Sequence, residues 1–373
     1  MTWERTKKAA IYLVLCIWLA AVVLPMAWVL LSSLRTSREF VRNPFGIPWL
    51  IAGAPANRRL SRAELARAHA AGKLPATALV RQFSVWDENG DGSLSEKEVR
   101  QCLEAGGVPA AALEPLYAAA DQPGDRSGPW AALKANYAKA WVKSNFSGYF
   151  SNSLIVTTCS LLGVLAAGAM AAYVLARFLF PGARALLLYF ISGLMIPAQL
   201  VLVPLFFQFT WLSEAGSRLL RPLGLELQLH DSLSGLILIY VSLSLPFTIL
   251  VLTGFFKTLP GALREAGIMD GCGEYRVFWH IMLPLARPGI ITAAIFNFLG
   301  IWNEYLFALV FVNSPEKKTL PLGLAAVSMQ AQYKTDFGLM FAGLVIVIAP
   351  TLLLYLVLQR QLTRGITVGA LKG

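Results

Sequence analysis

Six long apolar runs constrain the fold of this chain more than any other feature. About 20 consecutive apolar residues cross the hydrocarbon core of a bilayer as a helix, because only intrahelical hydrogen bonds satisfy the backbone there. The runs lie at residues 9–32, 150–176, 185–208, 233–256, 287–312 and 338–359. Hydrophobic residues make up 56% of the 373 residues, and the mean hydropathy of +0.59 excludes an ordinary soluble protein. We therefore expect an all-α membrane protein with six transmembrane helices.

Basic residues predict the orientation of these helices. Six spans put both termini on one side, where Lys and Arg outnumber Asp and Glu, whereas the two short loops on the other side are balanced. Cytoplasmic loops carry an excess of Lys and Arg, so we expect cytoplasmic termini and an extracytoplasmic loop at residues 33–149. The cytoplasmic segments and this long loop account for the net charge of +11, which requires no nucleic-acid partner. The first run lacks a convincing cleavage site and is expected to remain as a signal anchor.

Cysteine, histidine and glycine patterns give no sign of an enzyme. The four cysteines and three histidines are scattered, so neither a zinc site nor a Ser-His-Asp triad is expected. No G-x-x-x-x-G-K-[ST] phosphate loop occurs, so the chain alone is not expected to bind ATP. Any ATP hydrolysis is therefore expected in a separate partner subunit.

A polar segment at residues 265–284, between the fourth and fifth runs, carries a spaced motif. Its fixed positions are Glu265, Ala266, Gly271, Ile281, Leu283 and Pro284, with Gly267 where alanine is usual. The pattern resembles the EAA loop of ABC importer permeases. Similarity to the sugar-type permeases, in particular the maltose-type subunit with a cytoplasmic tail, covers about residues 1–50 and 134–373 and includes WNEYLFALV and the closing GITVGALKG. The alternative is an amphipathic connector on the membrane surface.

The resemblance implies that this loop docks on an ATP-binding subunit. The residues that it assigns to coupling are Glu265, Ala266, Gly267, Asp270, Gly271, Ile281, Leu283 and Pro284. Small residues would let a short helix approach its groove closely, and Glu265 near the helix start would suit the helix dipole. Gly267 in place of alanine is expected to loosen the helix by up to about 1 kcal/mol. The terminal Gly369, Lys372 and Gly373 match a tail that contacts the ATPase, the alternative being a frayed end.

Asn303 and Glu304 form a second candidate site. Glu304 is an acid within the fifth run, where an ionisable group is costly and indicates a pathway or a required pairing. We favour a helix-packing or gate role over direct contact with a solute. Trp302, Asn303 and Tyr305 would suit sugar binding by stacking and hydrogen bonds, but an interfacial aromatic belt explains the rings equally well.

Residues 51–133 differ in composition from their surroundings and predict a small soluble module, inserted between a first segment at 1–50 and a permease core at 134–373. Within the module, residues 87–98 resemble the EF-hand calcium loop. The ligands at its diagnostic positions are Asp87, Asn89, Asp91, Ser93, Ser95 and Glu98, with Ser93 contributing its backbone carbonyl. Oxygen ligands suit hard cations, and a bidentate glutamate favours calcium over magnesium, so calcium is the expected cofactor.

A second unit follows at residues 121–132. It keeps Asp121 and Asp125 but has Ala132 at the position of the last glutamate, which predicts a degenerate hand whose strand pairs with the strand around Leu94. A static structural role for calcium is the simpler reading. The sharper hypothesis is that calcium orders the module so that a binding protein docks on it.

Together these patterns predict the permease subunit of an ATP-driven ABC importer in the bacterial inner membrane, carrying a sugar or related polyol by alternating access. The expected partners are a second permease subunit, a dimer of ATP-binding subunits and an extracytoplasmic solute-binding protein. The alternative is a membrane-anchored calcium sensor without a transport role, and a third reading is an ion channel or proton-coupled carrier. The apolar helices identify neither the solute nor the residues that line its cavity.

Overall fold

Helices account for nearly all of the chain that the computed structural model describes. The described residues are 2–35, 37, 40, 44–45, 59–61, 93–95, 99, 101, 129–223, 227–334 and 336–370. The chain divides into two compact units, Met1–Lys143 with Ala331–Val345 and Ser144–Gln330 with Ile346–Gly373.

The first unit contains a long helix and a pair of short strands. Its elements are α1 (Thr2–Ser33), β1 (Arg59–Ser61), β2 (Ser93–Ser95), α9 (Pro129–Ala138) and the π-helical η2 (Lys139–Lys143). The strands are antiparallel with Leu60 opposite Leu94, and Val99 after β2 is fully buried. The strand expected around Leu94 is confirmed, and its partner among the described residues is β1. Residues 121–128 of the expected second hand lie outside the described residues, so its pairing stays a prediction. The upstream sequence RLSRAE at 59–64 repeats SLSEKE at 93–98, so the better partner precedes β2.

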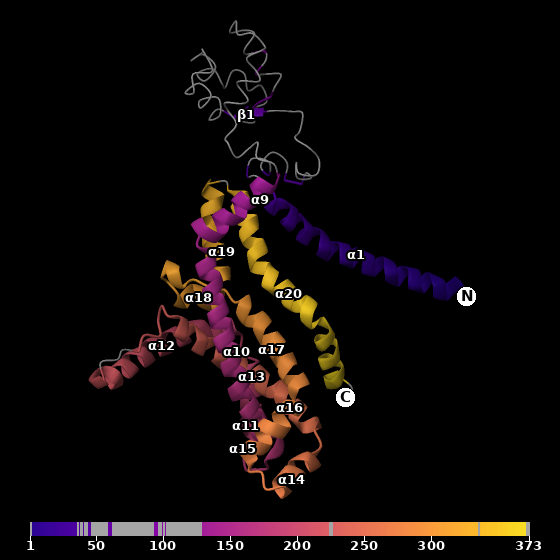
Figure 1. Ribbon diagram of the computed structural model, residues 1–373, viewed down its shortest axis with the longest axis vertical. Coiled ribbons are helices and arrows are strands. Elements are labelled where there is room, and N and C mark those ends of the chain that lie inside the picture. Colours follow the sequence, from indigo (N-terminus) through magenta and orange to yellow (C-terminus); the bar gives the residue numbers. More distant parts are fainter. Residues whose placement is uncertain are drawn as a thin grey trace. The chain divides into compact units, whose positions relative to one another are not determined.

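The second unit is a helical bundle (Figure 1). Its elements are α10 (Phe146–Arg177), α11 (Ala183–Gly193), α12 (Ala198–Leu220), the 3-10 helix η3 (Arg221–Leu223), α13 (Leu233–Thr258), α14 (Gly261–Met269), α15 (Glu274–Val277), the π-helical η4 (Phe278–Met282), α16 (Leu283–Leu285), α17 (Arg287–Trp302), α18 (Leu306–Phe311) and the 3-10 helix η5 (Pro315–Lys317). Two helices, α19 (Leu320–Lys334) and α20 (Phe337–Ala370), contain residues of both units.

Five helices of the described chain are long and apolar enough to cross a membrane, and a bent pair would make a sixth. The five are Ile11–Ser33, Phe146–Arg177, Ala198–Leu219, Leu233–Thr258 and Phe337–Gln359. The first, second, fourth and fifth of these coincide with predicted runs. The fold class of an all-α membrane protein is therefore confirmed, whereas two of the predicted spans need correction.

The predicted helix at residues 185–208 is broken. α11 ends at Gly193 and α12 begins at Ala198, so the helix of spanning length continues to Leu219 instead. Pro197 has an extended backbone with ψ of 125°, and a proline also disfavours the helical conformation in the residue before it. The apolar run is continuous in composition, but the proline divides it into two helices.

The predicted helix at residues 287–312 is broken as well. α17 ends at Trp302, and three residues separate it from α18. At its other end α17 joins the helical segment Glu274–Leu285 through a bend of 74°, and this bent pair is the candidate sixth span. Pro288 explains the bend, because a proline ring clashes with the carbonyl four residues earlier and lacks the N–H that would bond to it.

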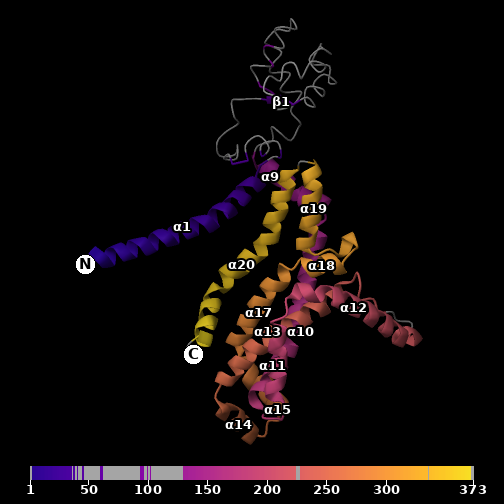
Figure 2. The same ribbon diagram turned by 180° about the vertical axis from the view of Figure 1, so that it is seen from behind.

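The helices α10, α13 and α17 lie side by side in both views of the ribbon (Figures 1 and 2). Gly168 on α10 lies so close to α13 that a Cβ there would stand 2.6 Å from Thr248 Cγ2. Asn297 on α17 donates a buried 2.7 Å hydrogen bond from Nδ2 to Thr248 Oγ1. Small residues and hydrogen bonds of this kind hold helices together where lipid provides no hydrophobic driving force. Thr248 is therefore the junction of the three helices.

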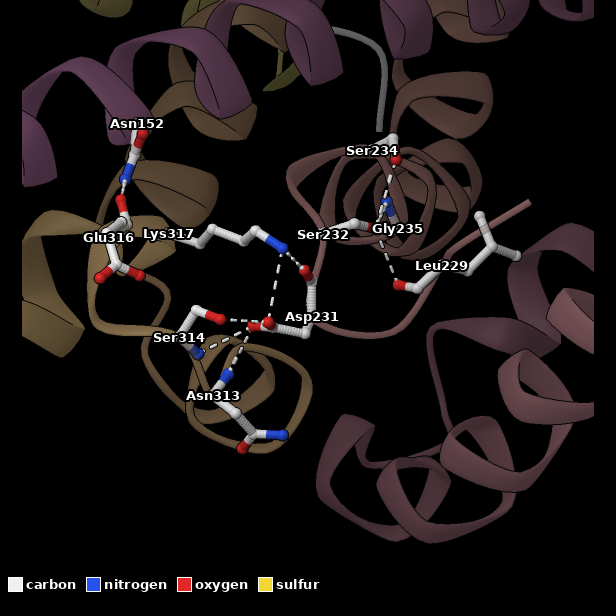
Figure 3. A network of polar contacts seen from close by, with 10 residues as sticks. All are labelled: Asn152, Leu229, Asp231, Ser232, Ser234, Gly235, Asn313, Ser314, Glu316 and Lys317. Carbon is white, nitrogen blue, oxygen red and sulfur yellow. Dashed lines mark hydrogen bonds and ion pairs between the residues drawn. The ribbon is translucent and has the colours of Figure 1, made fainter. Parts of the chain in front are cut away.

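Asp231, just before α13, binds the segment after α18 through a network of hydrogen bonds (Figure 3). Its Oδ1 accepts hydrogen bonds from the N–H groups of Asn313 and Ser314, both at 2.9 Å, and the Ser314 hydroxyl donates to Oδ2. Lys317 places Nζ 3.4 Å from the same Oδ2. Partial burial of Asp231 opposes ionisation, but these hydrogen bonds outweigh it and lower the pKa to about 2 from an ordinary value of 3.8. The segment after α18 is thus fixed to the start of α13 by an ionised carboxylate.

α10 holds the same segment through two side chains. Asn152 donates from Nδ2 to the carbonyl oxygens of Glu316 and Lys318, at 2.7 and 3.0 Å (Figure 3 shows the first). The next residue of α10, Ser153, accepts a hydrogen bond at its Oγ from the N–H of Leu320 at 2.7 Å. These contacts satisfy backbone groups that have no helical partner, so the turn between α18 and α19 is anchored to α10 as well as α13.

Asp231→Asn is expected to destabilise the protein at neutral pH by about 1 to 2 kcal/mol, because the charge is lost while asparagine still tolerates the positive φ of 46°. The pKa of Asp231 is lower in the folded than in the unfolded chain. Its stabilisation is therefore complete above about pH 4 and is lost as the pH falls through about 2. Thermal unfolding of wild type and variant in detergent should converge towards acid pH, and a constant difference would contradict this account.

Candidate functional site

The predicted coupling helix is α14, which follows the end of α13. The helix begins directly after Pro260, whose backbone is extended with φ of −61° and ψ of 131°. Glu265 is therefore the fifth of nine helical residues, and the first turn holds no acidic residue. The prediction that Glu265 lies near the helix start is wrong, because Pro260 fixes the start earlier in the chain.

Gly271 ends α14 in the way that its place in the motif requires. It has φ of +81°, in the left-handed region that glycine adopts without strain. The N–H of Gly271 donates to Ile268 O and the N–H of Cys272 to Gly267 O, both at 3.0 Å. This is a Schellman motif, in which a left-handed residue satisfies the last carbonyls of a helix and reverses the chain.

Gly267 is the buried residue of α14, and it faces its own chain. A Cβ at this position would lie 2.6 Å from Ile281 Cδ1 and 3.2 Å from Val277 Cγ2. The small size of Gly267 thus allows α14 to pack against α15 and η4. The sequence predicted that Gly267 lets the helix approach a partner's groove, but Gly267 instead lets the helix approach residues of its own chain.

The opposite face of α14 is exposed. Glu265, Ala266 and Asp270 are all exposed, and Met269, which sequence reasoning missed, is 86% exposed. Tyr275 on α15 is 83% exposed as well. Protein interfaces combine apolar anchors with a polar rim, and the exposed part of α14 and α15 carries side chains of both kinds.

Ile281, Leu283 and Pro284 lie in the segment between α14 and the bend. Ile281 belongs to the π-helical turn η4 and packs on Gly267, whereas Leu283 and Pro284 form the start of α16 just before the bend. A π-helical turn accommodates a following proline, because Pro284 has no N–H for the regular helical bond. The motif therefore spans a helix, a turn and a bend.

Two residues that sequence reasoning missed join the two sides of this loop. Arg264 on α14 donates from Nη2 to Glu274 Oε1, and from Nε to Glu274 Oε2 at 3.3 Å. The hydrogen bond to Glu274 raises the pKa of Arg264, so Arg264 stays positively charged. Ten positions separate these residues, and no helical period brings them together. The Gly271 turn does so, which is why spacing gave no signal.

Glu304 occupies the gap between α17 and α18. Its Oε1 accepts from the N–H of Phe307 at 2.9 Å, and its Oε2 accepts from the N–H of Ala308 at 3.2 Å and from Tyr240 Oη at 2.6 Å. Both carboxylate oxygens are engaged by the protein, which favours the helix-packing role. Asn303 donates from Nδ2 to a carbonyl of its own helix at 2.9 Å.

The remaining candidate residues lie mostly outside the described residues. Gly369 is in the last turn of α20, whereas Lys372 and Gly373 follow the described part of the chain. Of the calcium ligands, Ser93 and Ser95 begin and end β2. The other four expected ligands, Asp87, Asn89, Asp91 and Glu98, lie outside the described residues.

Tyr240→Phe is expected to lower the free energy of unfolding by about 1.5 to 3 kcal/mol, because the Glu304 carboxylate loses a hydrogen-bond donor inside the bundle. Tyr189→Phe is the matched control, since that ring on α11 is 72% exposed. Unfolding by SDS in mixed micelles, followed by circular dichroism, measures the difference. Equal stability of the two variants would mean that the hydrogen bond contributes nothing.

Comparisons with known proteins indicate the same family as the motif at residues 265–284. Residues 161–368 match the family model described as "binding-protein-dependent transport system inner membrane component". The diacetylchitobiose uptake system permease protein NgcG of Streptomyces coelicolor is 42% identical over 237 residues, which are 64% of this chain and 74% of that protein. The trehalose transport system permease protein SugB of Mycobacterium tuberculosis is 33% identical over 238 residues, 64% of this chain and 81% of that protein.

Further relatives extend the likeness to other bacteria and to a solved structure. A probable starch degradation products permease, AmyC of Thermoanaerobacterium thermosulfurigenes, is 32% identical over 65% of this chain and 82% of that protein. A bacterial ABC transporter involved in the import of the acidic polysaccharide alginate shares the fold at a TM-score of 0.50 and 21% identity, over 60% of this chain and 78% of that chain. The resemblance inferred from residues 265–284 is confirmed: this chain belongs to the family of binding-protein-dependent transport system inner membrane components, the permeases of ABC importers.

Proposed function

We propose that this chain is one permease subunit of an ATP-driven importer that carries a sugar or related polyol across the bacterial inner membrane. The observation that carries the proposal is the exposed face of α14 at one end of the bundle, in a chain of this family. The names of three relatives refer to diacetylchitobiose, starch degradation products and trehalose, which are all carbohydrates. A small carbohydrate is therefore the solute class that we infer.

In this proposal an ATP-binding subunit docks on the exposed face of α14. Met269 supplies an apolar anchor, and Glu265 and Asp270 supply the polar rim. Closure of two such subunits on ATP displaces α14, and the bundle then opens the solute path alternately to either side. A second permease completes the path, a solute-binding protein delivers the solute, and the terminal Gly369, Lys372 and Gly373 make a second contact with the ATPase.

The proposed orientation places α14 and both termini in the cytoplasm, as the excess of basic residues suggests. Asp231 precedes α13 and α14 follows it, so the Asp231 network belongs to the extracytoplasmic end. The inserted module at residues 51–133 then lies on the side from which the solute arrives.

Uptake by the reconstituted complex tests the proposal. The chain is co-expressed with an ATPase, a second permease and a binding protein chosen from its source genome, and the complex is purified into proteoliposomes. Labelled diacetylchitobiose, maltotriose and trehalose are supplied with the binding protein outside and ATP inside. ATP-dependent accumulation of one of them is expected. A calcium sensor without a transport role would neither retain an ATPase on purification nor accumulate any sugar.

Gly271→Val is expected to reduce both ATPase retention and uptake, since a β-branched residue is strained at φ of +81° and the end of α14 moves. Gly273→Val is the matched control two residues away. Gly273 has φ of −69°, and no atom lies within 4 Å of a Cβ built there. Equal loss in both variants would point to general intolerance of valine rather than to the shape of the α14 terminus.

We further propose that residues 87–98 bind one calcium ion. The register of β1 and β2 supports this, because Leu94 is at the position where paired EF-type loops exchange backbone hydrogen bonds, and Leu60 is opposite. The shift that aligns Leu60 with Leu94 also aligns Ser61 with Ser95 and Glu64 with Glu98. The segment around Leu60 lacks acids at the first ligand positions, so we propose it as the silent partner loop.

Calcium titration of the full chain in nanodiscs tests this site. Glu98→Gln is expected to abolish binding of one ion with a dissociation constant of about 0.1 to 1 mM, because the bidentate ligand is lost. Glu96→Gln removes an acid from a non-ligand position of the same loop and should bind as wild type does. Uptake measured over the same calcium range separates two roles. Equal uptake by Glu98→Gln and wild type at every concentration would leave calcium a structural role.

A further inference from the structure

The carboxylate of Glu274, the first residue of α15, is bound by two different helices. Arg264 on α14 donates to both of its oxygens, with Nε 3.3 Å from Oε2. Tyr173, in the last turns of α10, donates from Oη to the same Oε2 at 3.1 Å. One carboxylate therefore links the coupling helix to a long helix of the bundle.

Aromatic rings hold both arms of this link. The Tyr173 ring is 4% exposed, with centroids of Phe256 and Phe278 at 5.6 and 5.1 Å. The Arg264 guanidinium carbon lies 5.0 Å from the ring centroid of Phe178, directly after α10. Rings packed at these distances leave little rotational freedom, and a cation over a ring is attracted to it. The link is thus stiff in both directions.

α14 packs on α15 and η4 at its glycine. Gly267, the buried residue of the helix, brings no side chain to the contact with Ile281 and Val277. A displacement of α14 passes to the bundle through the groups that bind it most strongly, and hydrogen bonds to charged groups exceed neutral ones. Arg264 and Glu274 provide such bonds, and Tyr173 extends them to α10.

We propose that Glu274 is a positioning residue for transport, which passes the displacement of α14 to α10 through Arg264 and Tyr173. The inference rests on the proposed function, since an ATP-binding subunit must move α14. It adds the route by which the motion enters the bundle. Breaking the link leaves the exposed face of α14 in place, so the complex still assembles and hydrolyses ATP while less of the motion reaches α10.

The ratio of sugar accumulated to ATP hydrolysed, measured in the same proteoliposomes, tests the link. The probe is the labelled sugar that the wild-type complex accumulates. Glu274→Gln and Tyr173→Phe are each expected to lower this ratio by roughly 3- to 10-fold, with ATPase retention unchanged. The double exchange Arg264→Glu with Glu274→Arg should restore most of the ratio, because opposite charges face each other again.

The pair Glu214 and Arg218 on α12 is the matched control. These side chains lie 3.7 Å apart and are both exposed, so Glu214→Gln should leave the ratio unchanged. A normal ratio in Tyr173→Phe, which loses only a hydroxyl, would overturn the proposal even if Glu274→Gln failed to assemble. A wild-type complex that accumulates no sugar would instead overturn the proposed function, and this inference with it.

Discussion

Thr248 accepts a buried hydrogen bond from the side-chain amide of Asn297, and this contact lies where α10, α13 and α17 of the second unit meet. Gly168 lets α10 approach the same threonine, so one side chain sets the spacing of three helices. In lipid a polar contact of this kind contributes a larger share of helix association, because moving apolar side chains from lipid into contact with one another gives little free energy. Thr248 lies in the middle of α13. The Asp231 cluster lies before its first turn and α14 after its last.

Run length predicted most of the membrane helices, since bilayer thickness sets how many apolar residues a span needs. It failed where helices break, because hydropathy does not register backbone chemistry. Pro197 is as apolar as its neighbours yet ends one helix and begins another. Glu304 was recognised as costly, but its pairing with Tyr240, far away in the sequence, required the three-dimensional structure. The strand at Leu94 was predicted, but its upstream partner was not. The similarity of residues 59–64 to residues 93–98 indicates that partner, whereas the prediction relied on the acids Asp121 and Asp125 downstream.

In the predicted coupling loop, too, some features were predictable from the sequence and others were not. Its spacing located the loop, and Gly271 has the conformation that makes glycine necessary there. The side of α14 on which Gly267 lies depends on where the helix begins, and Pro260 sets that start. The pairing of Arg264 with Glu274 depends on the chain reversal at Gly271. Sequence reasoning thus identifies positions whose chemistry is local, and it misses contacts that exist only after the turn is made.

The glycine at position 267 has one more consequence. A helix attached by a buried methyl group would be held equally well in dilute and in concentrated salt. Here the attachment is shifted towards an ion pair whose side chains, Arg264 and Glu274, are 25% and 37% exposed. Partly exposed charges are screened over about 10 Å at 0.1 M salt. The stiffness of this end of the molecule therefore depends on ionic strength, and it decreases as the salt concentration of the surrounding solution rises.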